Sequence, residues 1–250
     1  MNFQHIYYPE TCWGGFTHVD GTIAFYTRVH SMLTNSSIAV DVGCGRGSYR
    51  DDPVRVRHDL RVLKGKCLKV IGMDVNANAA NNPFIDEFRL IKDDLWPLED
   101  DSINLCLADS VLEHIDDPEM FFKEAHRILK PGGYLCIRTP NIFSYFGLAA
   151  RLIPGRFRQK AICRVQDYRE VEDIFPTLYH CNTKRKMKQM MKKWGFESYV
   201  YGHEAEPSYL LFSRFFYFLG VLHQRFAPSM IKVTLFAFGQ KKKKRVVEVS

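Results

Sequence analysis

Short, mainly apolar runs recur along the chain and are separated by polar turns or by segments with helical spacing. Runs of this kind are typical of strands buried inside a sheet. Where such strands alternate with helices, the pattern favours an α/β fold with helices on both faces of a largely parallel sheet. The strands expected on this basis are 39–42, 70–74, 88–91, 103–108 and 134–138.

Two segments have the one-face apolar spacing of an amphipathic helix. The first is Pro118–Lys130, and Pro131-Gly132-Gly133 is expected to end it before the strand at 134–138. The second is the basic segment Lys184–Trp194, whose apolar stripe we expect to pack in the core. Its stripe consists of Met187, Met190, Met191 and Trp194.

A glycine turn follows the first predicted strand, and an acid ends the second. The turn reads D-x-G-x-G-x-G from Asp41 to Gly47, and the acid is Asp74. Backbone N–H groups of a glycine turn can approach a ligand closely, and an acid on the next strand can accept from ribose hydroxyls. The pair therefore predicts a nucleoside-bearing ligand at the carboxyl edge of the sheet.

The spacing of the glycines narrows the ligand. A dinucleotide fingerprint starting at Gly43 needs a glycine at position 48, which is Ser48, and no Gly-Lys-Ser/Thr follows as in a P-loop. Taken alone, the turn also fits a tight strand-to-helix turn in some other α/β protein.

The longer segment SINLCLADSVLEHIDDPEMFFKEAHRILKPGGYLCIRTPN, residues 102–141, is more specific. Together with the glycine turn it resembles the class I S-adenosylmethionine-dependent methyltransferases of the broad type-11 kind, over roughly residues 38–141. The resemblance implies a seven-stranded, mostly parallel sheet with helices on both faces and an antiparallel last strand. Strand-like residues 197–201 and 231–238 would form the closing hairpin.

The resemblance also implies which residues bind S-adenosylmethionine and its product S-adenosylhomocysteine. The three glycines would pass the methionine part, Asp74 would hold the ribose, and Asp93 or Asp94 would meet the adenine amino group. Asp74 stands 27 residues after Gly47, and Pro53 predicts an extended or broken first helix over 50–64. The expected cofactor residues are Asp41, Gly43, Gly45, Gly47, Asp74, Val75, Asp93, Asp94, Leu95 and Asp109.

For catalysis, His114 is the candidate general base because its side chain titrates near neutral pH. Glu113 or Asp109 is the carboxylate expected to orient it. The alternative is that Glu113 and His114 only cap and brace the loop. No metal is expected, because the seven cysteines form no CxxC pair and are read as small buried apolar residues in a reducing compartment.

The acceptor is expected to contact the parts outside the shared core. These are an aromatic lid at 1–37 and insertions at about 142–182 and 203–230 within a domain spanning 38–240; a basic tail follows at 241–250. Asn141, Tyr145 and Arg169 are the candidate substrate residues. The apolar stretch 209–226 favours packing on the sheet or on a second copy in a homodimer. Contact with a lipid-like acceptor, or with a membrane surface that also attracts the tail, is the alternative.

Charge limits the partners. The net charge is +7, of which Lys241–Arg245 contributes five, so the rest carries about +2. A nucleic-acid substrate is not expected, also because Ala108-Asp109-Ser110-Val111 lacks the motifs of base-modifying relatives. With no apolar leader in Met1–Gly21, a cytoplasmic protein is expected.

These features predict transfer of a methyl group, most simply to an oxygen of a small molecule or of a glycan or lipid intermediate. N- or C-methylation on the same fold is one alternative. A catalytically silent partner subunit that keeps the cofactor pocket is the other.

Overall fold

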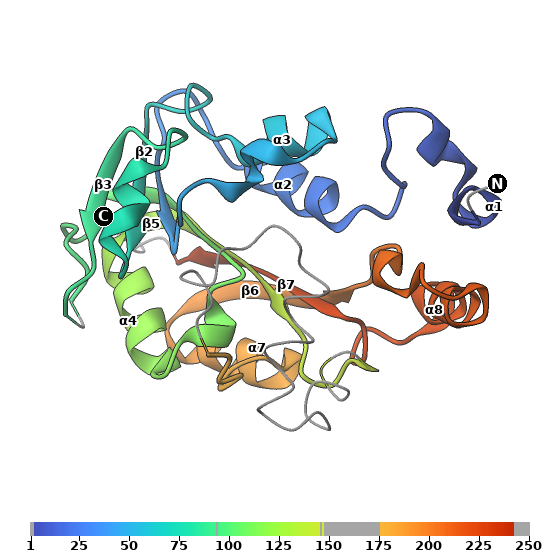
Figure 1. Cartoon of the computed structure of the whole chain (residues 1–250). Helices are drawn as coiled ribbons and strands as arrows, with labels where there is room; N and C mark the ends of the chain where they lie inside the picture. The colour runs from blue at the N-terminus through green and yellow to red at the C-terminus, as the bar shows by residue number, and fades with distance from the viewer. Residues whose placement is uncertain (1–2, 94, 146, 148–175, 243–250) are drawn as a thin grey trace, which may run out of the picture.

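A single mixed sheet forms the centre of the computed structural model, which describes residues 3–93, 95–145, 147 and 176–242 (Figure 1). Within these residues the sheet has seven strands in the order β3-β2-β1-β4-β5-β7-β6. The strands are β1 Ile38–Val42, β2 Lys69–Asp74, β3 Glu87–Leu90, β4 Ile103–Asp109, β5 Leu129–Pro140, β6 Phe196–His203 and β7 Thr234–Lys241.

Strand direction agrees with the predicted architecture. Strands β1 to β5 pair in parallel, whereas β7 lies antiparallel between β5 and β6. The chain runs outward from β1 to β3 on one side and from β4 to β5 on the other. The strand order therefore reverses between β1 and β4, and in open α/β sheets the carboxyl ends at such a point border the ligand site.

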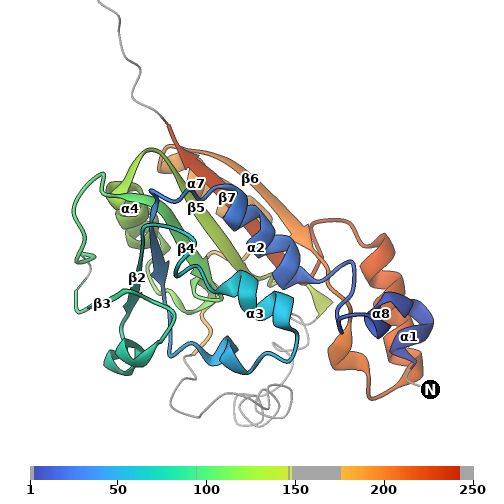
Figure 2. The same cartoon turned by 90° about the horizontal axis from the view of Figure 1, so that it is seen from above.

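Helices cover both faces of the sheet, as expected. α2 (Gly21–Ser31) and α3 (Arg55–Arg61) lie on one face, while α4 (Pro118–Ile128) and α7 (Lys184–Lys193) lie on the other (Figures 1 and 2). Neighbouring strand residues alternate between these layers. Ala39 packs in the cluster that contains Phe25 of α2, and Val40 packs in the cluster that contains Phe122 of α4.

The methionine stripe of α7 is core, as predicted. Met187, Met190 and Met191 are buried in the same cluster as the inner face of α4. Trp194 packs against this cluster, and its indole N–H donates to Glu119 at 3.0 Å. The basic residues of α7 consequently face outward.

A smaller unit stands beside the sheet at the right of Figure 1. It combines the N-terminal α1 (Gln4–Tyr7) and η1 (Pro9–Cys12) with η6 (Ser208–Leu210) and α8 (Arg214–Phe226). Its own cluster centres on the fully buried Tyr217, which contacts Phe3 edge to face at 5.2 Å. The insertion at 203–230 therefore packs on the N-terminal segment.

Several helices and strands begin or end at residues other than those predicted. Helix α4 ends at Ile128, and Pro131-Gly132-Gly133 lies inside β5, which starts at Leu129. A register shift between Ile103 and Leu105 absorbs the extra residues, so the glycines form an irregularity in the strand. The segment after the glycine turn is a broken helix, with η2 (Ser48–Asp51) separated from α3 by Pro53.

The last strand continues past its predicted end. β7 includes Lys241, whose ammonium group donates to Asp101 at 2.6 Å and to the carbonyl oxygens of His126 and Leu129, each at 2.7 Å. The first lysine of the basic run is thus a buried part of the sheet. Residues 243–250 lie outside the described part of the chain.

Candidate functional site

The glycine turn after β1 is held in place by β2 and by one asparagine. The Gly43 amide donates to the Met73 carbonyl oxygen at 2.7 Å, and the Gly45 amide donates to the Asp74 carboxylate at 3.0 Å. The side-chain amide of Asn82 donates to the carbonyl oxygens of Cys44 and Gly45. These bonds fix the turn and place Asp74 directly beside it.

Two of the glycines have different surroundings. Both adopt positive φ, +67° at Gly43 and +52° at Gly45. A Cβ added at Gly43 would lie 2.5 Å from Val111 Cγ2, whereas a Cβ at Gly45 would meet no protein atom within 4 Å. Gly43 is therefore required by packing. Gly45 faces open space, into which a ligand can approach the backbone.

Asp41 lies under the turn in a partly shielded, acidic environment. The pKa of its carboxyl is raised to about 7, mainly by burial and also by the Asp109 and Asp74 carboxylates, against the opposing effect of Arg61. Because this carboxylate is poorly compensated, a cation placed beside it would be stabilised.

Two exposed apolar side chains border the carboxyl ends of β2 and β3. Val75 and Leu95 are 60% and 65% exposed. Asp93 is also exposed on the loop after β3, whereas Asp94 lies outside the described residues. Apolar side chains at a sheet edge suit the faces of an aromatic ring.

Asp109, at the carboxyl end of β4, forms a buried ion pair with Arg138 of β5. The guanidinium Nε and Nη2 donate to the two carboxylate oxygens, each at 2.6 Å, and the Tyr26 hydroxyl donates at 2.8 Å. Burial alone would raise the pKa of Asp109, but Arg138 and then Arg61 hold it well below its usual range. Asp109 is thus a tightly paired anion.

Glu113 and His114 lie in η4 (Leu112–His114), directly after β4. Glu113 is buried and accepts from the Thr139 hydroxyl at 2.8 Å, and burial raises the pKa of its carboxyl. His114 Nδ1 lies 3.0 Å from the carbonyl oxygen of Pro176. A backbone carbonyl therefore holds this nitrogen, where we expected a carboxylate from Glu113 or Asp109.

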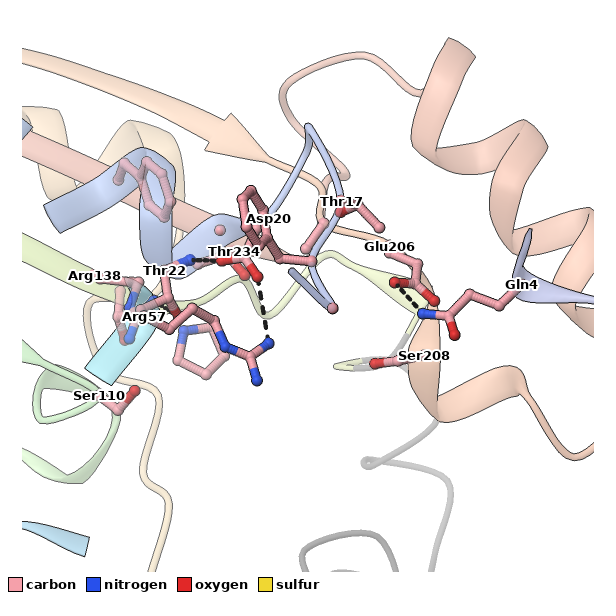
Figure 3. A pocket seen from close by; sticks show the side chains of 17 residues that line it. Gln4, Thr17, Asp20, Thr22, Arg57, Ser110, Arg138, Glu206, Ser208 and Thr234 are labelled. Atoms are coloured by element: carbon pink, nitrogen blue, oxygen red, sulfur yellow. Dashed lines mark hydrogen bonds and ion pairs between the residues drawn. The ribbon is translucent and has the colours of Figure 1, made fainter. Parts of the chain in front are cut away.

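A cavity of about 400 Å³ opens beside the Asp109–Arg138 pair; Arg138 and Thr139 line it, whereas Glu113 and His114 do not (Figure 3). Its walls come from distant parts of the chain: the N-terminal segment and the start of α2, Arg57 of α3, the ends of β4 and β5, and residues 205–208. Ser110 and Thr139 place it at the carboxyl ends of β4 and β5. No residue of the glycine turn lines the cavity; the link between them is Ser110 of the lining, whose neighbour Val111 stands beside Gly43.

The expected substrate residues lie elsewhere. Asn141 is buried and donates to the carbonyl oxygens of Met230 and Lys232, each at 2.8 Å. The hydroxyl of Tyr145 bonds to that of Tyr209, and burial raises the pKa of Tyr145. Neither residue lines the cavity, and Arg169 lies outside the described residues.

The site also depends on residues that the sequence did not single out. Asn82 ties down the glycine turn, and Arg138 neutralises Asp109. Arg138 did leave a signal, because it is a cation directly after the apolar run Tyr134–Ile137. Asn82 precedes Pro83 in an ordinary Asn-Pro turn, and nothing in this sequence context indicates its role.

Comparison with known families identifies this arrangement. A family model described as "Methyltransferase domain" matches residues 24–200. The chain belongs to this methyltransferase family. The open backbone at Gly45, the adjoining Asp74 and the acidic surroundings of Asp41 fit a cationic nucleoside such as S-adenosylmethionine.

A curated relative matches part of the chain. A Mycolicibacterium smegmatis protein named "Probable S-adenosylmethionine-dependent methyltransferase" is 28% identical over 111 residues, covering 42% of this chain and 39% of its own. The chain spans less than half the length of the curated relatives it matches.

Solved methyltransferase structures share the fold. A chain from the Haloferax volcanii complex of the Trm112 methyltransferase activator and a methyltransferase has a TM-score of 0.57 and 16% identity, covering 88% of this chain and 90% of its own. Geranyl diphosphate C-methyltransferase from Streptomyces coelicolor, solved with S-adenosylhomocysteine, has a TM-score of 0.53 and 15% identity, covering 88% and 78%.

Proposed function

We propose that this methyltransferase-family chain is an active enzyme that transfers a methyl group from S-adenosylmethionine to a hydroxyl group of a neutral, polar acceptor. A small polyhydroxylated molecule, a glycan or the headgroup of a lipid has this chemistry. The observation that carries the proposal is the charge-balanced, hydroxyl-lined cavity of about 400 Å³ at the carboxyl ends of β4 and β5.

The cofactor roles follow from the geometry of the turn. Gly45 presents its backbone to the methionine part, and Asp41 provides the carboxylate for the methionine ammonium group. Asp74 accepts from the ribose hydroxyls, since its carboxylate lies beside the turn, where it already accepts from the Gly45 amide. Val75 and Leu95 pack on the adenine, with Asp93 or Asp94 accepting from its amino group. When bound, the cofactor supplies a methyl group on a cationic sulfur leaving group.

The charges of the cavity favour a neutral acceptor. Arg57 and Arg138 are its cationic lining residues and Asp20 and Glu206 its anionic ones. Arg57 is paired with Asp52 at 2.7 Å and with Asp20 at 3.3 Å, and Arg138 is paired with Asp109. Because both guanidinium groups already have carboxylate partners, a phosphate-bearing acceptor would gain little from them.

Hydroxyl groups and the side-chain amide of Gln4 supply the rest of the polar lining. They can donate to and accept from an acceptor hydroxyl, so they suit a polyol better than a planar apolar molecule. The hydroxyl side chains of the lining are Thr17, Thr22, Ser110, Thr139, Ser208 and Thr234.

We assign the removal of the acceptor proton to His114, which lies in η4 after β4 and is not among the residues that line the cavity. The carbonyl of Pro176 accepts from Nδ1–H, so the tautomer with the lone pair on Nε2 is favoured. Glu113, bonded to Thr139 of the cavity wall, is a positioning residue that connects η4 to the cavity.

The test is methyl transfer from labelled S-adenosylmethionine to a panel of polyols, sugars and lipid headgroups, beside amines and diphosphates of similar size. We expect labelled product from a neutral hydroxyl compound. Ser208→Ala, on the cavity wall, should raise KM for that acceptor without changing cofactor affinity. Transfer only to amines or to carbon would contradict the proposed acceptor atom. Cofactor binding with no transfer to any acceptor would favour a silent partner subunit.

A further inference from the structure

Helix α8 presents an apolar stripe that the rest of the described chain leaves uncovered. Its inner face is buried at Tyr217, Gly220 and Val221. The outer residues recur at the three- and four-residue spacing of one helix face. They are Phe212, Phe215, Phe216, Leu219, Leu222 and Phe226, with exposures from 37% to 77%. We call these six residues the α8 stripe.

Charge indicates what covers the α8 stripe. From Ser208 to Lys232 the sequence contains no aspartate or glutamate but has Arg214, Arg225 and Lys232. A cationic segment with exposed phenylalanines matches a bilayer that carries anionic lipids, because the rings enter the headgroup region and the cations remain at its surface. The described helices include none long and apolar enough to cross a membrane.

Helix α8, which carries the stripe on its outer face, is connected to the cavity through its inner face. Glu206 lines the cavity and accepts from the hydroxyl of Tyr217, on the opposite face of α8, at 2.8 Å. Figure 3 shows Glu206 and its partner Gln4 on the side of the cavity next to the α1 and α8 unit. Beyond α8, the exposed Met230 accepts from Asn141 at the end of β5. The apolar surface therefore lies on the same edge of the sheet as the cavity.

We propose that the chain binds a membrane surface through the α8 stripe and that its acceptor is a polar headgroup presented by that membrane. The second part rests on the proposed function; the first does not. A bilayer-bound α8 would hold the cavity wall at 205–208 close to the headgroup layer, so a lipid-linked hydroxyl could enter without leaving the membrane.

The test is sedimentation of the full chain with vesicles of phosphatidylcholine alone or with about one-third phosphatidylglycerol, at low and at raised salt. Phe215→Ser/Phe226→Ser removes side chains that are 64% and 77% exposed. Leu68→Ser/Tyr199→Ser, at sites 65% and 72% exposed away from α8, is the matched control.

We expect binding to the anionic vesicles that weakens with salt and falls at least about tenfold in the α8 variant but not in the control. Equal loss in both variants, or no vesicle binding by the unaltered chain, would overturn the proposal. A dimer detected by light scattering that is lost in the α8 variant and kept in the control would also overturn it. Because vesicle binding is measured without methyl transfer, its result is independent of the proposed activity.

Discussion

Arg138 and Asp109 face each other in register across β5 and β4, and the guanidinium group donates to both carboxylate oxygens at 2.6 Å. Arg138 also donates to Thr22 of α2 at 2.9 Å and lies over the ring of Phe25. The pair therefore joins two strands and the first covering helix at the edge that carries the cavity.

Removing Arg138 should be costly. Arg138→Met leaves a buried carboxylate without its main partner, and we expect a loss of about 3 to 5 kcal/mol in the free energy of unfolding. Urea unfolding measures this loss. Lys193→Met, which breaks the exposed pair with Glu119, is the control and should cost less than about 1 kcal/mol. Equal costs would show that the Arg138 pair is not a structural element of the site.

Alanine substitutions at Gly43 and Gly45 should destabilise the protein to different extents, because only Gly43 is packed against a side chain. Gly43→Ala forces a Cβ to 2.5 Å from Val111, so the protein should lose several kcal/mol of stability. Gly45→Ala meets no neighbour and should cost only about 1 to 2 kcal/mol, from its positive φ. Thermal unfolding of both variants without cofactor tests this order, which an equal or reversed effect would contradict.

Asp41 should make stability depend on pH. Its pKa is raised from 3.8 to about 7 in the folded protein, so between these values the folded state binds more protons than the unfolded state. This contribution is fully present below the unfolded pKa and is lost as the pH rises through about 7. Asp41→Asn should remove it.

The measurement is urea unfolding of the protein and of Asp41→Asn at pH 5 and pH 8. From pH 5 to pH 8, the free energy of unfolding of the unaltered protein should fall by about 1 to 3 kcal/mol relative to that of the variant. This range allows for the partial exposure of Asp41. A constant difference between the two proteins would mean that Asp41 titrates normally.

The role proposed for His114 predicts an effect on turnover and none on cofactor affinity. His114→Ala is expected to lower kcat by about a hundredfold or more while leaving cofactor affinity unchanged, because a general base acts on the acceptor proton. His180→Ala is a matched control, since His180 Nδ1 also bonds a backbone carbonyl, that of Asp116, at 2.7 Å. An unchanged rate in His114→Ala would leave His114 as a brace of the loop.

The sheet and the glycine turn could be predicted because their signals are local. An apolar run such as Ile103–Ala108 is buried wherever the sheet places it, and the D-x-G-x-G-x-G spacing is read within one turn. The bounds of β5 could not be predicted, because the Pro-Gly-Gly residues join the strand only through the shifted register with β4.

The cavity could not be predicted for a similar reason. Thr22, Arg57, Ser110 and Glu206 share no sequence pattern and meet only when α2, α3, β4 and the segment after β6 assemble. Likewise, Asn82 holds the glycine turn from 37 residues away through two backbone carbonyls, which a motif of glycines and acids does not encode.

We propose above that S-adenosylmethionine binds with its methionine part against the open backbone at Gly45. The most direct measurement is isothermal titration of S-adenosylmethionine into the full chain and into Gly45→Ala. We expect one binding site in the unaltered protein and affinity at least about tenfold weaker in the variant, whose added Cβ occupies the ligand's space. No binding to the unaltered protein, or equal affinity in both, would contradict it.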